Sequence, residues 1–148
     1  MGFNFRLTNL QAALGLAQVE RIDEIVERKR WIGASYQARL GDVAGLQLPV
    51  EEAWARQVYW MYGVVLEEST GLDALEFARR LQDRGVQTRP FFLGMHQQPA
   101  LLQRGLFEGQ RFPVTERLAR QGLYLPSGLS LTEEQVDTVC AAVRQALA

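Results

Sequence analysis

The first forty residues combine apolar and charged positions with helical spacing. Apolar residues recur there every three or four positions: Leu10, Ala13, Leu14 and Ala17, then, slightly out of phase, Ile22, Ile25, Val26, Ile32, Tyr36 and Leu40. Thr8 and Gln11 have the spacing of a capping box, in which each side chain bonds the other residue's backbone N–H. The pattern predicts a helix over residues 8–40, with a bend between Val19 and Ile22 where the stripes change phase.

This helix is too long for the small sheet that the rest of the chain can form. Its early turns carry small side chains that would let another helix approach closely: Ala12, Ala13, Gly15 and Ala17. We therefore expect residues 1–41 to be a helical segment that bridges to a large domain outside these 148 residues. Residues 42–148 are expected to form a small α+β domain.

Further along, the pattern changes to short apolar runs between turn residues. Residues 58–66 are nearly all apolar and rich in aromatic and β-branched side chains, which predicts a central strand covered on both faces. Two shorter strands are predicted at 86–89, ended by Pro90, and at 123–125. Residues 46–49 are expected to lead into a loop.

Three more helices have recognisable start signals. Asp73 and Thr132 are expected N-caps, and Pro113 occupies the favoured first turn of a helix. The first of these helices should end near Gly85 and the second at Gly122. The segment 91–112 is irregular, with one helical turn expected near 99–103. The whole is predicted to be an α+β layer structure: a long helix and a three-stranded sheet with flanking helices.

Composition excludes several classes of protein. Hydrophobic residues make up 47% of the chain and charged residues 22%, and the net charge is −1, so neither nucleic acid nor an anionic membrane is an expected partner. No run reaches the roughly 18 apolar residues of a membrane span. The first residues lack the apolar core of a signal peptide and look cut from a longer chain. The lone Cys140 lies on an apolar helical face, which indicates core packing and a reducing, cytoplasmic location.

Local motifs for catalysis are scarce. The chain has no glycine-rich phosphate loop, HExxH, CxxC or nucleophile elbow, and one histidine with one cysteine makes a metal site improbable. Lys29 is the only lysine, and its place in a charged helical face indicates a surface residue.

Three places carry groups suited to a ligand, each with a structural alternative. Asn4 and Arg6 precede a helix N-terminus, which suits an anion, or they form a capping loop with a surface arginine. Arg89 stands beside two phenylalanines and could grip an anion or a ring, or simply cover the core. His96 lies in the irregular loop, where it could contact a ligand or only be packed or solvated.

Together these segments resemble a known family. Residues 2–18, GFNFRLTNLQAALGLAQ, are similar to the GYNYRMTNIQAALGLAQ stretch of the DegT/DnrJ/EryC1/StrS family. Residues 85–99, GVQTRPFFLGMHQQP, resemble its GI-TR-FF-PLH-QP segment, and residues 125–136, LPSGLSLTEEQV, resemble its closing LPSG–LTEEQ. The resemblance covers essentially the whole chain. Its members are pyridoxal-phosphate-dependent aminotransferases that act on nucleotide-linked keto sugars.

The resemblance implies that most of the cofactor site lies in a domain outside these residues. In this family, of fold type I, a large N-terminal domain holds the cofactor through a Schiff-base lysine, an aspartate and a stacked aromatic, none of which has a matching position here. The family pattern implies that Asn4 reaches the cofactor phosphate of the partner subunit. It implies that Arg6 meets a substrate carboxylate or phosphate and that His96 lies near the nucleotide sugar. Arg89 is a further substrate-binding candidate. The chain departs from the pattern at Leu93-Gly94-Met95, from which we expect a looser loop.

The resemblance thus implies the C-terminal part of a homodimeric sugar aminotransferase, inactive alone, with an amino acid such as glutamate as donor. Two alternatives stay open. The chain could be a stand-alone dimerisation or ligand-binding domain, because the apolar stripe of the first helix calls for a cover. It could also be the tail of a related sugar dehydratase, in which histidine replaces the Schiff-base lysine.

Overall fold

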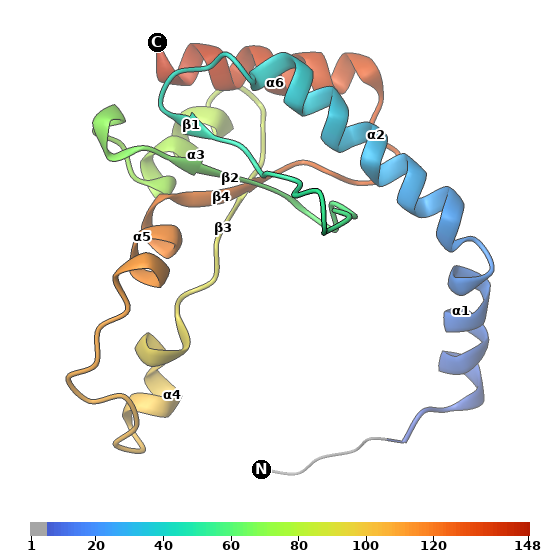
Figure 1. Cartoon of the computed structure of the whole chain (residues 1–148), viewed down its shortest axis with the longest axis horizontal. Helices are drawn as coiled ribbons and strands as arrows, with labels where there is room; N and C mark the ends of the chain where they lie inside the picture. The colour runs from blue at the N-terminus through green and yellow to red at the C-terminus, as the bar shows by residue number, and fades with distance from the viewer. Residues whose placement is uncertain (1–5) are drawn as a thin grey trace.

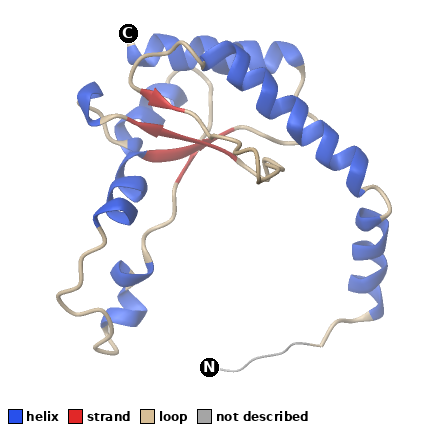
Figure 2. Cartoon of the chain, in the orientation of Figure 1, coloured by secondary structure: helices blue, strands red, loops and turns tan. Residues whose placement is uncertain are grey.

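The computed structural model describes residues 6–148, which form one antiparallel sheet with helices packed on it (Figure 1). The helices are α1 (Asn9–Val19), α2 (Ile22–Leu40), α3 (Ala74–Gln82), α4 (Pro99–Leu102), α5 (Pro113–Gln121) and α6 (Glu133–Leu147). The strands are β1 (Leu46–Gln47), β2 (Tyr62–Leu66), β3 (Arg89–Pro90) and β4 (Gly122–Leu125), with 3-10 turns η1 (Glu68–Thr70) and η2 (Met95–Gln97). The α+β class is confirmed, and Figure 2 shows the strands gathered in one small sheet.

The sheet has four strands in the order β1-β2-β4-β3, and every neighbouring pair is antiparallel. The prediction of three strands was therefore wrong. The additional strand, β1, pairs Leu46 with Leu66 and Gln47 with Val65. Two residues are too few for an alternating pattern to be recognised in the sequence.

One face of the sheet forms the core. Side chains of β2 alternate, so Tyr62, Val64 and Leu66 share a face, and Leu123 and Leu125 of β4 lie beside them in the register. Apolar residues of α2, α3 and α6 complete this core: Ile32, Tyr36, Leu40, Ala74, Phe77, Leu81, Val136, Val139, Cys140, Ala142, Val143 and Ala146. The predicted apolar faces are confirmed at these positions, and Cys140 is buried as expected. Ile22, which was predicted to share the face of α2, is 49% exposed, so the prediction was wrong for this residue.

The opposite face of the sheet is built around two glycines. A Cβ added at Gly63 would lie 2.7 Å from Cζ of Phe91, and one added at Gly122 would lie 2.2 Å from its Cδ2. The Phe91 ring therefore lies directly on the backbone of β2 and β4, and it also packs on Tyr124 with centroids 4.5 Å apart. The Phe91 N–H donates to the Gly122 carbonyl at 2.9 Å. These contacts fasten the segment after β3 to the sheet.

The central strand begins later than predicted. Tyr59 has a positive φ of 48°, which breaks the extended backbone, so β2 starts at Tyr62 and the prediction for 58–61 was wrong. The Tyr59 ring packs on the backbone of Gly33, where a Cβ would be 2.7 Å from the ring. Within β2 itself, burial on both faces is confirmed, because four of its five residues are buried.

The strand predicted at 86–89 lies elsewhere. β3 is Arg89–Pro90, and Pro90 belongs to it instead of ending it. This strand pairs only with β4 at the edge of the sheet, where a residue without an N–H is tolerated. Val86 is buried by the turn that follows α3, and its N–H donates to the Leu81 carbonyl.

The predicted helix starts are confirmed. Thr8 with Gln11 and Thr132 with Gln135 form complete capping boxes, and Asp73 accepts from the Glu76 N–H. Pro113 opens α5, and a helical turn forms at α4.

The long helix is divided where the bend was expected. The chain turns at positions 20–21, between α1 and α2. α2 packs on α6 and enters the core, whereas α1 has no buried residue within the described chain. Figure 1 shows the chain as an arch, with α1 on one side and α4 on the other. The bridge between residues 1–41 and another domain stays a prediction.

Candidate functional site

His96 lies in a small polar cluster between η2 and α5. Its Nε2 is 3.2 Å from Oε1 of Glu116, and its side chain is 6% exposed. The ring of Phe112 packs on it, with centroids 4.8 Å apart. Within the described chain, His96 is therefore a packed histidine with a polar partner, although it lies in the irregular segment.

Glu116 is the hub of this cluster. It accepts a hydrogen bond from the Phe112 N–H at 3.0 Å and forms an ion pair with Arg111 at 3.1 Å. The Arg111 guanidinium, followed by the Phe112 N–H, lowers the pKa of the Glu116 carboxyl to about 2. Sequence reasoning missed Glu116. An acidic residue in the first turn after Pro113 was the available signal, since the N-terminal turn of a helix favours a negative charge.

Gly94 tightens the loop instead of loosening it. It is buried, and its carbonyl accepts from the Gln97 N–H at 2.9 Å. A Cβ at this position would lie 2.7 Å from Cε1 and 2.9 Å from Nδ1 of His96. The expectation of a looser loop was wrong, because the missing side chain lets the imidazole ring close against the backbone.

An open hollow lies beside the cluster. It has a volume of about 400 Å³, and its walls come from η2, α4, α5 and the loop between the two helices: His96, Gln97, Leu102, Phe107, Gly109, Gln110, Arg111 and Glu116. Amide, imidazole and guanidinium groups around a carboxylate suit a polar ligand that carries hydroxyl groups.

The other predicted site residues are spread over the arch. Arg89 lies in β3 opposite Tyr124 and is exposed. Arg6 is exposed just before the Thr8 cap. Asn4 lies outside the described residues. In Figure 1, α1, which begins shortly after Arg6, and α4, which follows η2 along the chain, lie on opposite sides of the arch.

Lys29 is not the simple surface lysine that the pattern predicted. Its Nζ donates to the carbonyl of Trp60 at 2.9 Å and to that of Ser127 at 2.5 Å. Burial lowers the pKa of this amine. Lys29 thus ties α2 to the segment before β2 and to the turn after β4.

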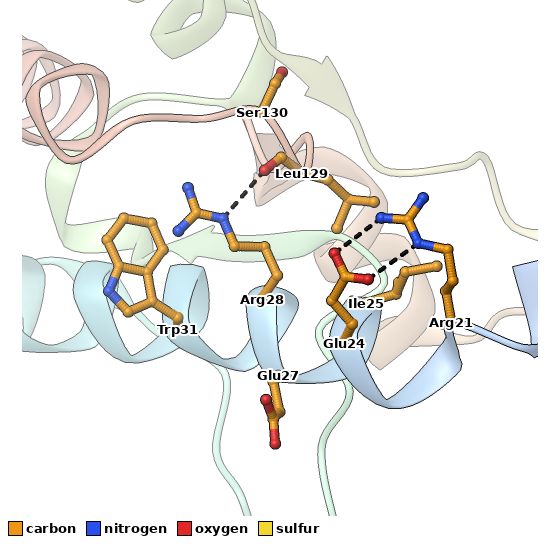
Figure 3. Close-up of a pocket in the computed structure, with 8 residues that line it drawn as sticks. All are labelled: Arg21, Glu24, Ile25, Glu27, Arg28, Trp31, Leu129 and Ser130. Carbon is orange, nitrogen blue, oxygen red and sulfur yellow. Dashed lines mark hydrogen bonds and ion pairs between the residues drawn. The ribbon is translucent and has the colours of Figure 1, made fainter.

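Another groove lies along α2, and its polar side chains are bonded within the chain (Figure 3). It holds about 590 Å³ between α2 and the loop that follows β4. Its cations are engaged within the chain: Arg21 pairs with Glu24 at 2.9 Å, and Arg28 donates to the Leu129 carbonyl at 3.1 Å. The Arg28 guanidinium also stacks 4.0 Å from the Trp31 ring centroid. The bond from Arg28 to the Leu129 carbonyl fixes α2 on the loop, and none of the predicted site residues lies here.

Two further properties bear on the chemistry. Among residues 6–148 no cluster of three or more metal-ligating side chains occurs, and no helix there is long and apolar enough to cross a bilayer. Burial raises the pKa of the Cys140 thiol to about 11, so this cysteine is not an activated nucleophile.

Comparison with known proteins decides the family. The sequence model of the DegT/DnrJ/EryC1/StrS aminotransferase family matches residues 1–144. The chain belongs to this family. Within the DegT/DnrJ/EryC1/StrS family it is 37% identical over 150 residues to a GDP-perosamine synthase of Caulobacter vibrioides, covering 99% of this chain and 39% of that protein. A GDP-perosamine synthase of Escherichia coli O157:H7 is 32% identical over 145 residues, covering 98% and 38%.

Solved structures of the DegT/DnrJ/EryC1/StrS type agree with the fold. DesV of S. venezuelae, in complex with a ketimine intermediate, is 30% identical with a TM-score of 0.85 over 99% of this chain and 38% of that one. The aminotransferase TlmJ from Streptoalloteichus hindustanus is 33% identical, with a TM-score of 0.78 over 93% and 35%. The chain spans 38–39% of the length of the two GDP-perosamine synthases.

Acid should remove the contribution of Glu116 to stability. The pKa of the Glu116 carboxyl is about 2 in the folded protein, below its ordinary value of 4.5. Its charged form therefore stabilises the fold fully above pH 4.5, and this contribution is lost as the pH falls from 4.5 through about 2. Chemical unfolding of the full-length protein and its Glu116→Gln variant should show the largest difference near neutral pH and convergence near pH 2. The Arg111→Ala variant should show a smaller acid dependence than wild type. A difference between wild type and Glu116→Gln that grows towards pH 2 would contradict the assignment.

Proposed function

We propose that these residues form the C-terminal part of a pyridoxal-phosphate-dependent aminotransferase that acts on a nucleotide-linked keto sugar. The match of the family over residues 1–144 carries this proposal, and the GDP-perosamine synthases at 32% and 37% identity support a nucleotide-sugar substrate. In such a transfer, the amino group of an amino acid such as glutamate replaces the carbonyl oxygen of the sugar, which leaves as water, and a second water supplies the new carbonyl oxygen of the amino acid's carbon skeleton. The amino acid leaves as a 2-oxo acid and the sugar as an amino sugar.

The described residues do not form a cofactor site by themselves. A Schiff base requires an accessible amine, and the only lysine, Lys29, has its Nζ bound to the carbonyls of Trp60 and Ser127. Pyridoxal phosphate supplies an electron sink when it is bound. We place the lysine, and the main cofactor pocket with it, in a part of the protein outside these 148 residues, so that this part alone is inactive.

Within this proposal the site residues serve as ligands for anions and for the sugar. The exposed guanidinium groups of Arg6 and Arg89 suit phosphate or carboxylate groups, which they can bind in a bidentate manner. Asn4 is assigned to the cofactor phosphate of the partner subunit, and His96 to the nucleotide sugar. α1 and α4 lie on opposite sides of the arch in Figure 1, and within this proposal the complete site is shared between two copies of the chain.

Trapping the cofactor tests the proposal. The full-length protein is incubated with pyridoxal phosphate and reduced with borohydride, and the labelled peptide is identified by mass spectrometry. The label is expected on a lysine outside residues 1–148, and Lys29→Arg should retain it. Absence of label, or label on Lys29, would overturn the proposal. Absence of label with turnover of the sugar to a dehydrated product would favour the dehydratase.

The alternative of a stand-alone dimerisation domain draws on one observation. On α1, Leu16 at 59% exposure and Val19 at 64% lie on one side, and Leu10 at 81% and Leu14 at 71%, one turn apart, form an exposed apolar face on the other. Such a face fits an interface, and in the aminotransferase it would be covered by the remaining part of the protein or by the second copy. If cells contain this segment as a separate product that dimerises without cofactor, the alternative replaces the aminotransferase.

A further inference from the structure

We infer that Glu116 is a positioning residue for His96, which fixes the proton on Nε2 and orients the ring towards the nucleotide sugar. The kinetic part of this inference rests on the proposed function, whereas the tautomer does not depend on it. Nothing in the sequence motifs pointed to Glu116, and its role follows from the contacts of its two carboxylate oxygens.

The carboxylate is held independently of the histidine. The Phe112 N–H, at the start of α5, donates to Oε1, and Arg111 pairs with Oε2 at 3.1 Å. The Glu116 side chain is only 15% exposed. Two donors that do not involve His96 therefore fix the position of the carboxylate, so Glu116 is the fixed partner and His96 is the one that is oriented.

The state of Glu116 determines the tautomer of His96. Because the pKa of Glu116 is lowered to about 2, the group is a carboxylate near neutral pH and can only accept a hydrogen bond. Nε2 of His96, 3.2 Å from Oε1, must therefore be the donor. In the neutral ring this leaves Nδ1 without a proton, and an O–H or N–H of a ligand must reach it past Gly94, whose backbone lies at the same edge of the ring.

The ring has no space to turn away. On one side its Nδ1–Cε1 edge lies so close to Gly94 that a Cβ there would be 2.7–2.9 Å away. On another side, the Phe112 ring packs at 4.8 Å. Glu116 closes the Nε2 edge. A histidine held from three sides has lost its rotational freedom before a ligand arrives, which reduces the entropic cost of binding.

Nitrogen NMR tests the tautomer directly. Full-length protein labelled with ¹⁵N-histidine is compared with His96→Gln, which identifies the His96 signals by their loss. Wild type is expected to carry the proton on Nε2. Glu116→Gln, whose amide oxygen can still accept from Nε2, should keep this tautomer, whereas Glu116→Ala should give a mixture. A wild-type ring protonated on Nδ1, or an unchanged tautomer in Glu116→Ala, would overturn the inference.

Kinetics then separates positioning from a merely structural role. Glu116→Ala is expected to raise KM for the nucleotide sugar about tenfold, the effect of one lost positioned hydrogen bond, with kcat nearly unchanged. Glu116→Gln should restore KM to within about threefold of wild type.

The two possible failures are distinguishable. An equal loss of kcat in Glu116→Ala and Glu116→Gln would show a structural role and refute positioning. A full-length protein that transfers no amino group would refute the proposed function, and the NMR comparison would still decide the role of Glu116.

Discussion

Replacement of Phe77 by alanine is expected to destabilise the domain by about 3–5 kcal/mol. Phe77 lies on α3 and is 0% exposed, with its ring in the core formed by β2, β4, α2 and α6. Truncation removes the buried ring and leaves a cavity that close-packed neighbours fill only partly. Hydrogen-exchange mass spectrometry of peptides from α3 and α6, in the full-length protein, measures the loss as a lower free energy of opening.

Leu75 provides the matched control. It lies two residues away on the same helix, and its side chain is 69% exposed. Leu75→Ala should change the opening free energy by no more than about 0.5 kcal/mol. Equal effects of the two substitutions would show that α3 does not contribute its Phe77 face to the core.

Replacement of Gly122 by alanine is expected to cost at least about 3 kcal/mol, the upper end of the range for overpacking. The new Cβ would lie 2.2 Å from Phe91 and 2.6 Å from the Leu118 carbonyl oxygen. The phenylalanine ring could turn aside, but the carbonyl belongs to α5 and accepts the hydrogen bond of the Gly122 N–H. Relief of one contact therefore does not relieve the other, and the segment after β3 should detach from the sheet.

Gly128→Ala is the control for this substitution. Nothing lies within 4 Å of a Cβ at Gly128, so its effect should stay within about 0.5 kcal/mol. Thermal unfolding of the two full-length variants compares them. In a Phe91→Ala background, Gly122→Ala should be less harmful than in wild type but still destabilising, because the carbonyl contact remains. Full recovery there would contradict the second contact.

The elements that could be predicted from the sequence are those with local signals. The Thr8–Gln11 and Thr132–Gln135 boxes begin helices where predicted, because capping depends on residues within one turn. The bend between α1 and α2 followed from the phase of the apolar stripes alone.

The elements that the sequence did not reveal depend on distant contacts. β1 exists because Leu46 and Gln47 meet the far end of β2, and no local pattern records that pairing. The late start of β2 depends on Tyr59, whose left-handed backbone is matched to the space above Gly33. The β-branched Val58 and the aromatic Tyr59 and Trp60 favour a strand, and tertiary packing overrides this preference.

For the same reason, only one member of the His96–Glu116 pair could be predicted from the sequence. His96 stood out because its residue type is rare and lies in an irregular segment. Glu116 did not, because a glutamate in a first helical turn is common, and its distinction arises only when η2 folds against α5. The close contacts at Gly94 and Gly122 could not be predicted from the sequence either. Gly94 and Gly122 matter through the atoms that occupy the place of their missing side chains, His96 and Phe91.

α1 and α6 both begin with a Thr-x-x-Gln capping box, but they differ in the contacts that stabilise them. α1 has 11 residues and none of them is buried in the described chain, and helices shorter than about 12–15 residues are marginal in water because nucleation is costly. Its box adds only about 1 kcal/mol. We therefore expect the helix–coil equilibrium of α1 to depend on whether a surface from outside residues 6–148 covers Leu10 and Leu14. α6 buries six residues, so its order is a property of the chain itself.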